Sequence, residues 1–427
     1  LGACQAAGLA EMGFEVLGVD NDAGKVASLS RGRAPFYEPG LDALLRRHVG
    51  TGRLRFTASL AAAAEFGDVH FLCLGTPQRA DCEAADLSQL HQVVEGLGPL
   101  LRRQCLVVGR STVPVGTAAD IARRLTELAP AGLDVEVAWN PEFLREGSAL
   151  SDVLRPDRIV VGVQDSAAEK ALRQIYAHPL AAGVPLVVTD LATAELVKVA
   201  ANAFLATKLS FINAIADLCS AVGGDVVSLS DAIGHDARIG RSHLDAGLGF
   251  GGGCLPKDVR GFAVRAGELG VDKMSALLGL VDDINSERRE LLVELAVQEC
   301  CGEVAGKAIC VLGAAFKPGS DDVRDSPALA VASRLHRRGA RVRVFDPRAK
   351  VKAAAECPEL EYADSVGQAA QDADLVMHLT DWPEFGAIDA ERLGAQVARR
   401  RIVDGRNSLD RDVWRAAGWT YVGVGRG

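Results

Sequence analysis

The chain has 427 residues, enough for two or three domains. Hydrophobic residues make up 48% and charged residues 24%, which excludes a disordered chain, a coiled coil and a collagen-like fibre. The formal net charge of −9 argues against a nucleic-acid partner. No uninterrupted apolar stretch reaches the ~18 residues of a membrane helix, so no membrane partner is expected either.

The ten cysteines include no C-x-x-C pair, so no metal site is predicted. Cys73 and Cys310 lie in apolar runs and are predicted to be buried side chains. This cysteine usage, without a recognisable signal peptide, favours a reducing, cytoplasmic location.

The first half of the chain alternates helical patterns with apolar runs. A helical pattern covers 1–13, and strands are predicted at 14–20, 69–75, 104–112, 135–141 and 158–163. Near-continuous apolar strands separated by helices indicate a parallel sheet covered on both faces, the doubly wound α/β fold. A strand and a Gly-rich turn normally precede such an opening helix, so we expect the first strand of this domain to be missing.

The pattern changes after 190. One long helix is predicted over 191–222, because this stretch contains no Gly or Pro and is rich in Ala, Leu and Lys. Alternation resumes with strands at 307–313, 340–347, 372–380 and 401–407, and with a helix at 326–339 that Ser326 caps and Gly339 ends. We therefore predict two Rossmann-like domains, 1–190 and 301–427, joined by a helical segment at 191–300.

Asp20 ends the predicted strand at 14–20, where a carboxylate can accept both hydroxyls of an adenosine ribose, which favours NAD over NADP. Gly2 would be the last glycine of a G-x-G-x-x-G turn, and Lys25 follows in the next helix. Thr76 and Thr112 also follow apolar strands, so they are expected to face a ligand. A helix cap at Asp20 and simple turns at the threonines are the structural alternatives.

The segment NPEFLREG at 140–147 places Glu142 and Glu146 four residues apart, on one face if the segment is a helical turn. Arg145 would partly neutralise them, and a solvated face is the alternative. On the long helix, a stripe of polar residues would be costly to bury unless each has a partner. It consists of Glu195, Lys198, Asn202 and Asn213, and it either stabilises an oxyanion or faces solvent.

The segment GLGFGGGCLPKD at 247–258 carries the strongest local signal. Its glycines would let backbone N–H groups approach a ligand. Cys254 follows them, and the nearby Lys257 would favour its nucleophilic thiolate; Asp258 comes next. A buried structural cysteine is the alternative. Lys317, Arg324 and Arg406 lie beyond strand ends, where they suit a pyrophosphate or an anionic sugar.

The ordered set of motifs resembles the UDP-glucose/GDP-mannose dehydrogenase family of NAD-dependent, four-electron sugar-nucleotide oxidoreductases. The motifs are FYEPGL, GTP, STVPVG, NPEFLREG, KVAANAFLATKLSFIN, DARIG, GFGGGCLPKD, FKPGSDDVRDSPA and DGRN. The resemblance implies an NAD-binding domain, a UDP-sugar-binding domain, and a long central helix that builds a homodimer or a higher oligomer.

The resemblance also implies residue roles. Cys254 would capture the sugar aldehyde as a thiohemiacetal that is then oxidised to a thioester. Lys198 and Asn202 would stabilise oxyanions, and Asp258, Thr112 and Glu142 would position water and the sugar hydroxyl. The implied cofactor contacts are Gly2, Asp20, Lys25, Thr76, Thr112, Glu146, Lys257 and Arg324. The implied substrate contacts are Glu142, Phe143, Leu144, Lys198, Asn202, Arg238 from a neighbouring subunit, Phe250, Gly251, Lys317 and Arg406.

Three positions depart from the family pattern and are expected to tune affinity, namely His243, Ala214 and Gly253. The missing first strand is expected to weaken NAD binding. FYEPGL with DARIG favours oxidation of UDP-glucose to UDP-glucuronate. The same chemistry on GDP-mannose or a UDP-N-acetylhexosamine remains open, as does a non-catalytic nucleotide-sugar-binding relative.

Overall fold

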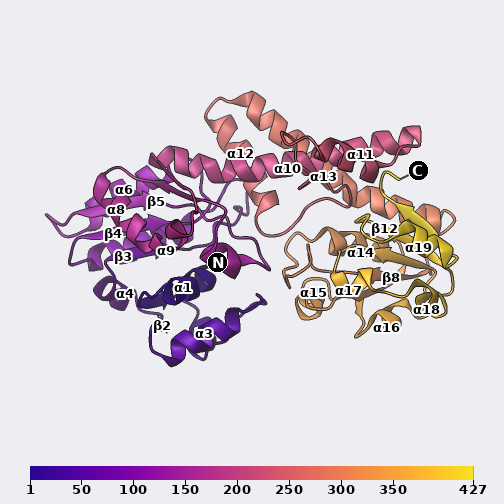
Figure 1. The fold of residues 1–427 in the computed structure, drawn as a ribbon, viewed down its shortest axis with the longest axis horizontal. Helices are drawn as coiled ribbons and strands as arrows, with labels where there is room; N and C mark the ends of the chain where they lie inside the picture. The colour runs from indigo at the N-terminus through magenta and orange to yellow at the C-terminus, as the bar shows by residue number, and fades with distance from the viewer. Residues whose placement is uncertain (427) are drawn as a thin grey trace. The chain divides into compact units, whose positions relative to one another are not determined.

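The computed structural model describes residues 1–426, which divide into two compact α/β units (Figure 1). The N-terminal unit comprises Leu1–Ala201 and Val264–Leu269. The C-terminal unit comprises Asn202–Ala263 and the residues from Gly270 onward. Each unit has its own hydrogen-bonded strands, β1 to β7 in the first and β8 to β13 in the second.

The N-terminal unit contains a sheet of order β3-β4-β5-β6-β7 and a separate parallel pair, β1-β2. The predicted fully parallel sheet is wrong at one place, because β5 and β6 meet antiparallel where Trp139 pairs with Gly162. The connection between them holds only the six-residue helix α7, not a long crossover helix, and β6 enters the sheet reversed. The strands are β1 Val16–Val19, β2 Leu54–Thr57, β3 Val69–Leu72, β4 Cys105–Gly109, β5 Val135–Trp139, β6 Ile159–Gly162 and β7 Leu186–Thr189.

Helices cover both faces of the five-stranded sheet, as the doubly wound pattern predicts. Val107 of β4 packs in one buried cluster with α5 and α6, whereas the adjacent Val108 packs in another with α8. The helices are α1 Gly2–Glu11, α2 Ala23–Ser30, α3 Leu41–Gly50, α4 Leu60–Phe66, α5 Ser88–Leu97, the 3₁₀ turn η1 Gly98–Leu100, α6 Thr117–Leu128, α7 Ala149–Leu154, α8 Ser166–Ile175 and α9 Ala177–Ala181.

The C-terminal unit contains a fully parallel six-stranded sheet of order β10-β9-β8-β11-β12-β13. The strand order reverses between β8 and β11, and ligands of such sheets bind beyond the carboxyl ends of the strands at that point. The strands are β8 Ala308–Leu312, β9 Arg341–Phe345, β10 Glu361–Tyr362, β11 Leu375–His378, β12 Arg401–Asp404 and β13 Thr420–Gly423.

The predicted helix limits of this unit are confirmed. Ser326 caps α14, its hydroxyl accepting a hydrogen bond from the N–H of Leu329, and Gly339 follows the helix with a φ of +89°. The remaining helices are α10 Leu191–Val222, α11 Val226–Gly234, α12 Leu255–Glu268, α13 Asp272–Glu299, α14 Pro327–Arg337, α15 Lys350–Glu356, α16 Val366–Ala370, α17 Pro383–Gly386, α18 Ala390–Gly394 and α19 Arg411–Ala416.

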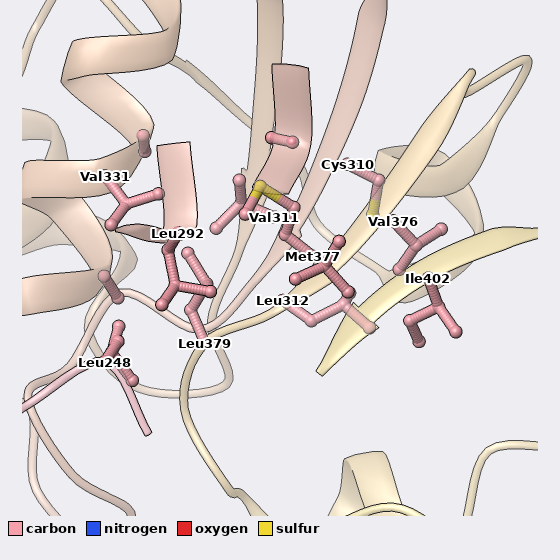
Figure 2. Packing of buried hydrophobic residues seen from close by; sticks show 14 of the residues in the cluster. Leu248, Leu292, Cys310, Val311, Leu312, Val331, Val376, Met377, Leu379 and Ile402 are labelled. Carbon is pink, nitrogen blue, oxygen red and sulfur yellow. The ribbon is translucent and has the colours of Figure 1, made fainter. Parts of the chain in front are cut away.

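A buried cluster of aliphatic side chains fixes the central strands of the C-terminal sheet (Figure 2). Val311 of β8, Met377 of β11 and Ile402 of β12 are all fully buried within it. Leu292 of α13 and Leu248, in the glycine-rich segment 247–258, pack into the same cluster. This core therefore anchors the loop that carries Cys254 as well as the sheet.

Helix α10 has the predicted length. By length and composition alone it is long and apolar enough to cross a membrane, and 44% of its most apolar window is buried within the protein. Core helices pass the same test, and five polar side chains of α10 are buried. These five are Glu195, Lys198, Asn202, Ser210 and Asn213.

Candidate active site

Cys254 lies directly before α12, at the end of the glycine-rich loop. Its carbonyl accepts a hydrogen bond of that helix from the backbone N–H of Asp258, at 3.0 Å. A helix N-terminus carries partial positive charge and favours anions such as a thiolate. The residue is only partly buried, as a nucleophile that must meet a substrate requires.

Asp258 has a partner on each oxygen of its carboxylate. The side-chain amide of Asn202 donates to Oδ2 at 2.6 Å, and Nζ of Lys257 lies 2.5 Å from Oδ1. Asp258 and Asn202 are both buried. This pairing joins α10 to the first turn of α12 and brings Asn202 and Asp258 together, while Lys257 forms an ion pair with Asp258.

Two asparagines that face the glycine-rich loop hold its backbone. The side chain of Asn285 accepts from the N–H of Phe250 at 2.7 Å and donates to its carbonyl at 3.1 Å. The carbonyl oxygen of the Asn213 side chain accepts from the N–H of Gly247 at 2.8 Å. Sequence reasoning singled out Asn213 but missed Asn285, because a single Asn in a long helical pattern carries no signal of a distant partner.

The glycines of this loop are explained by packing against protein atoms. A Cβ at Gly251 would collide with the carbonyl oxygen of Asp325, and one at Gly247 would collide with the carbonyl oxygen of Gly405. Gly252 has a φ of +89° and faces the ring of Phe316. These close contacts within its own unit explain why the loop needs glycine at these positions, and the expectation that it also brings backbone N–H groups to a ligand stays a prediction.

Lys198 and Glu142 form a buried ion pair in the N-terminal unit, with Nζ and Oε1 3.3 Å apart. The other carboxylate oxygen of Glu142 accepts from the N–H of Leu144 at 2.7 Å. The ring of Phe143 lies beside this pair, its centroid 5.6 Å from the Lys198 ammonium and 3.8 Å from the guanidinium carbon of Arg158. The residues after β5 thus assemble around Lys198.

The helical turn expected for Glu142 and Glu146 is wrong. Residues 140–145 have no regular structure, residues 146–148 form a turn, and α7 begins only at Ala149. Arg145 does not neutralise these glutamates, because its guanidinium forms an ion pair with Asp152 at 2.5 Å. The hydrogen bond from the N–H of Leu144 to Glu142 holds the segment in an irregular conformation instead.

Glu195 is also buried and paired. Its two carboxylate oxygens accept from the backbone N–H groups of Gly116 at 2.7 Å and Ala118 at 2.6 Å, at the start of α6. Burial raises the pKa of Glu195, against the lowering effect of these bonds and of Arg265. The alternative of a solvent-facing stripe on α10 is therefore wrong, and each of its four polar side chains has a partner within the protein.

The candidate cofactor contacts Asp20 and Lys25 follow β1. Asp22, not Asp20, caps α2, and one oxygen of Asp20 accepts from the N–H of Asp22 at 2.9 Å. Nζ of Lys25 lies 4.0 Å from the other Asp20 oxygen. Gly2 is the first residue of α1. A partly exposed carboxylate after β1 therefore fits the hydroxyls of a ribose, and the start of α1 fits an anion.

Thr76 and Thr112 meet beyond the ends of β3 and β4. The hydroxyl of the buried Thr76 donates to the carbonyl of Thr112 at 2.7 Å. Ser111 strengthens the junction, because its hydroxyl donates to the carbonyl of Leu74 at 2.7 Å. The hydroxyl of Thr76 therefore ties the two loops to each other, and the expectation that the two threonines face a ligand stays a prediction.

Arg406 lies across the point where the C-terminal sheet reverses its strand order. Its guanidinium donates to the carbonyls of Leu379, beyond β11, at 2.9 Å, and of Phe316, beyond β8, at 3.0 Å. Lys317 lies next to Phe316, with its ammonium 5.7 Å from the centre of that ring. Burial lowers the pKa of Arg406, while Asp381 and Asp404 raise it.

The other two predicted cationic contacts are more exposed. Arg324 forms an ion pair with Asp322 at 2.5 Å and lies so close to Gly253 that a side chain there would displace its guanidinium. Arg238 is paired with Asp236 at 2.6 Å, and its side chain is 90% exposed. Such exposure suits a contact with a neighbouring subunit.

Three family models match the chain in order. They describe the NAD-binding domain, the central domain and the UDP-binding domain of the UDP-glucose/GDP-mannose dehydrogenase family, over residues 1–180, 192–287 and 310–411.

Individual relatives agree with these models. A UDP-glucose 6-dehydrogenase of Rhizobium meliloti is 41% identical over 98% of this chain and 95% of its own. The structure of a UDP-glucose dehydrogenase from Pyrobaculum islandicum matches with a TM-score of 0.91 at 38% identity, over 100% of this chain and 95% of that one. A UDP-D-ManNAc dehydrogenase from Pyrococcus horikoshii matches with a TM-score of 0.86 at 26% identity, over 99% and 96%.

Proposed function

Because the chain belongs to the UDP-glucose/GDP-mannose dehydrogenase family and uses NAD as its cofactor, we propose that it oxidises UDP-glucose to UDP-glucuronate. One observation carries the choice of sugar. Identity is 41% to a UDP-glucose 6-dehydrogenase and only 26% to a UDP-D-ManNAc dehydrogenase, although both comparisons span nearly the whole chain.

The proposed reaction removes four electrons from C6 of the sugar. Bound NAD would supply the hydride acceptor for each of the two oxidations. Asp20 would hold the adenosine ribose, with Lys25, Thr76 and Arg324 around the cofactor, and the start of α1 at Gly2 would face its pyrophosphate. Glu146, Thr112 and Lys257 complete the proposed cofactor contacts.

Cys254 is the proposed nucleophile. Its thiolate attacks the C6 aldehyde that the first oxidation produces, and a C–S bond forms as the carbonyl becomes an alkoxide. The second oxidation converts this thiohemiacetal to a thioester, and water then cleaves the C–S bond to release the carboxylate and the thiol. The position of Cys254 before α12 supports this role, because the helix N-terminus stabilises the thiolate.

Two side chains of α10 would stabilise the oxyanions of these steps. The Lys198 ammonium and the Asn202 amide are both buried, so their interaction with a developing alkoxide is little weakened by water. Asp258, Glu142 and Thr112 would accept protons from, or orient, the sugar hydroxyl and the attacking water.

The UDP-sugar would be held by residues of the loops already described. These are Phe143 and Leu144 beside Glu142, Phe250 and Gly251 before the cysteine, and Lys317 and Arg406 at the C-terminal sheet. We propose domain limits of 1–190, 191–300 and 301–427, and a reducing cytoplasmic location, which the buried thiols of Cys4 and Cys310 support.

The proposed oligomer is a dimer built on α10. Phe204, Phe211 and Leu218 recur every seven residues along this helix, and each is more than half exposed. A stripe of large apolar side chains at this spacing is typical of a helix that packs against another helix. Arg238 of one subunit would then contact the substrate of its neighbour.

The test is the yield of NADH from a limiting amount of each nucleotide sugar. Two NADH per UDP-glucose, with at most slow formation from GDP-mannose and UDP-N-acetylhexosamines, is the expected result. Faster turnover of one of those sugars would show that it, and not UDP-glucose, is the substrate. Binding of UDP-sugars without NADH formation from any of them would indicate a non-catalytic relative.

A further inference from the structure

The C-terminal sheet contains a fully buried carboxylate, Asp404, that accepts four hydrogen bonds. Its Oδ1 accepts from the ring nitrogen Nδ1 of His378 at 2.9 Å and from the backbone N–H of Arg406 at 3.0 Å. Its Oδ2 accepts from the hydroxyl of Tyr421 at 2.8 Å and from the N–H of Leu409 at 2.9 Å. These four donors offset the cost of burying the charge.

The imidazole of His378 is buried and forms its hydrogen bond through one ring nitrogen. Its Nδ1 bonds to Asp404, whereas its Nε2 is buried and has no hydrogen-bond partner among the described residues. The ring of Phe385 packs edge-on against the imidazole at 5.8 Å. The polar contact of this imidazole is therefore the hydrogen bond between Nδ1 and Asp404.

Three neighbouring parallel strands supply this network. His378 ends β11, Asp404 ends β12, and Tyr421 lies in β13. His378 pairs directly with Asp404 in the sheet register. The network therefore lies at the carboxyl edge of the sheet, the edge at which parallel sheets bind ligands.

The network of His378, Asp404 and Tyr421 holds the backbone of Arg406 in position. The backbone N–H of Arg406 bonds to Asp404, and its side chain reaches the carbonyls of Leu379 and Phe316 on the two sides of the strand-order reversal. Asp404 also holds Leu409, so both ends of the turn 404–409 are attached to the same carboxylate. A change at either His378 or Tyr421 removes one of the two hydrogen bonds on one oxygen of that carboxylate, and so loosens the end of the turn that the same oxygen holds.

We infer that Asp404, with His378 and Tyr421, positions Arg406 to bind the diphosphate of the nucleotide sugar. The inference rests on the proposed function, which gives Arg406 that ligand. Asp404, His378 and Tyr421 are positioning residues, since they reach the ligand only through Arg406. They set the affinity for the nucleotide and leave the chemistry at Cys254 unchanged.

The test titrates the intact protein with UDP by calorimetry, in the wild type and in two variants that each remove one donor. Tyr421→Phe deletes one hydroxyl, and His378→Leu removes the Nδ1 donor. Each is expected to raise the Kd for UDP by about three- to tenfold, less than the full effect of losing a hydrogen bond to a charged group, because the lost bond acts on the ligand only through Arg406. The KM for UDP-glucose should rise by the same factor, while kcat stays within about twofold.

Two control variants separate positioning from general destabilisation. Tyr362→Phe deletes a hydroxyl that donates to the carbonyls of Ala353 and Cys357 in the same unit, and it should leave the Kd for UDP unchanged. His378→Asn keeps a donor near the place of Nδ1 and should restore most of the affinity lost in His378→Leu.

Each outcome decides the inference. Unchanged UDP affinity in both Tyr421→Phe and His378→Leu, with lowered thermal stability, would show that the network only stabilises the fold. An equal loss of affinity in Tyr362→Phe would contradict a specific path through Asp404. If the wild-type protein does not bind UDP, that result contradicts the proposed function itself and the inference that rests on it.

Discussion

The ammonium of Lys198 lies 3.3 Å from the carboxylate of Glu142, and both side chains are about 93% buried. The pair joins the long helix α10 to the irregular segment that follows β5. Neither charge is stable in such a place without the other, because burial removes the water that would solvate it.

Replacing Lys198 with Met should lower kcat/KM by about a hundred- to a thousandfold, because the oxyanions lose a buried cation. It should also destabilise the fold by about 3–5 kcal/mol, since Glu142 is left as an uncompensated buried charge. The exposed Lys170 on α8 offers a matched control, and Lys170→Met should change neither quantity. Initial rates and thermal unfolding measure the two effects.

The double variant Lys198→Met/Glu142→Gln separates these effects. It removes both charges, so thermal stability should recover towards the wild-type value. Turnover should not recover, because no cation is restored. Parallel recovery of stability and turnover would mean that Lys198 acts only through the fold.

Two glycines, one packed in the glycine-rich loop and one with open space around it in α13, predict opposite results for Gly→Ala variants. Gly251→Ala should lower stability and turnover sharply, because the added methyl group collides with the carbonyl of Asp325 and displaces the loop before Cys254. Gly279→Ala in α13 meets no atom within 4 Å and should raise stability by about 0.5–1 kcal/mol. Denaturant unfolding of both variants is the measurement, and a stable, active Gly251→Ala would disprove the packing explanation.

The buried carboxyl of Glu195 predicts a pH dependence of stability. Burial raises the pKa of Glu195 from its ordinary 4.5, so the folded state holds the proton more tightly than the unfolded state. Its contribution to stability is fully present below pH 4.5 and is lost as the pH rises through the raised pKa. Each tenfold difference between the folded and unfolded acid constants corresponds to about 1.4 kcal/mol.

Glu195→Gln cannot titrate and isolates this effect. The stability of the wild type minus that of the variant, from unfolding between pH 4.5 and 8, should therefore decrease as the pH rises. A difference that stays constant over this range would show that Glu195 has an ordinary pKa.

The apolar stripe on α10 predicts the oligomeric state. Phe211→Glu with Leu218→Glu would place two charges in the proposed helix–helix interface and should convert a dimer to a monomer. Val351→Glu on α15 is the control, because Val351 is highly exposed and lies outside the stripe. Light scattering after size-exclusion chromatography gives the mass, and an unchanged mass in the double variant would contradict the assignment.

Sequence patterns predicted the elements whose cause is local. The apolar strands, the cap of α14 by Ser326 and the length of α10 depend on residues near each other in the chain, and all three are confirmed. The need of buried Lys198 and Asn202 for partners was also predictable, because burying a polar group without one is costly. The identities of those partners were not.

The errors have a tertiary cause. A spacing of four placed Glu142 and Glu146 on a helix, but the hydrogen bond that the Glu142 carboxylate accepts from the N–H of Leu144 and the ion pair with Lys198 hold that segment in an irregular conformation. The contacts that require glycine at 247 and 251 come from Gly405 and Asp325, which are remote in sequence. The direction of β6 in the sheet could not be predicted either, because a run of apolar residues indicates a buried strand but not its orientation.

The most direct test of the catalytic proposal is mass spectrometry of protein quenched with acid during turnover of UDP-glucose with NAD. The peptide that carries Cys254 is expected to gain the mass of a UDP-hexose acyl group, as the thioester requires. Cys254→Ser should show no adduct and no sustained NADH formation while still binding UDP, and the exposed Cys82→Ser should behave as the wild type. Sustained turnover in Cys254→Ser, with no adduct on the wild-type peptide, would contradict covalent capture at Cys254.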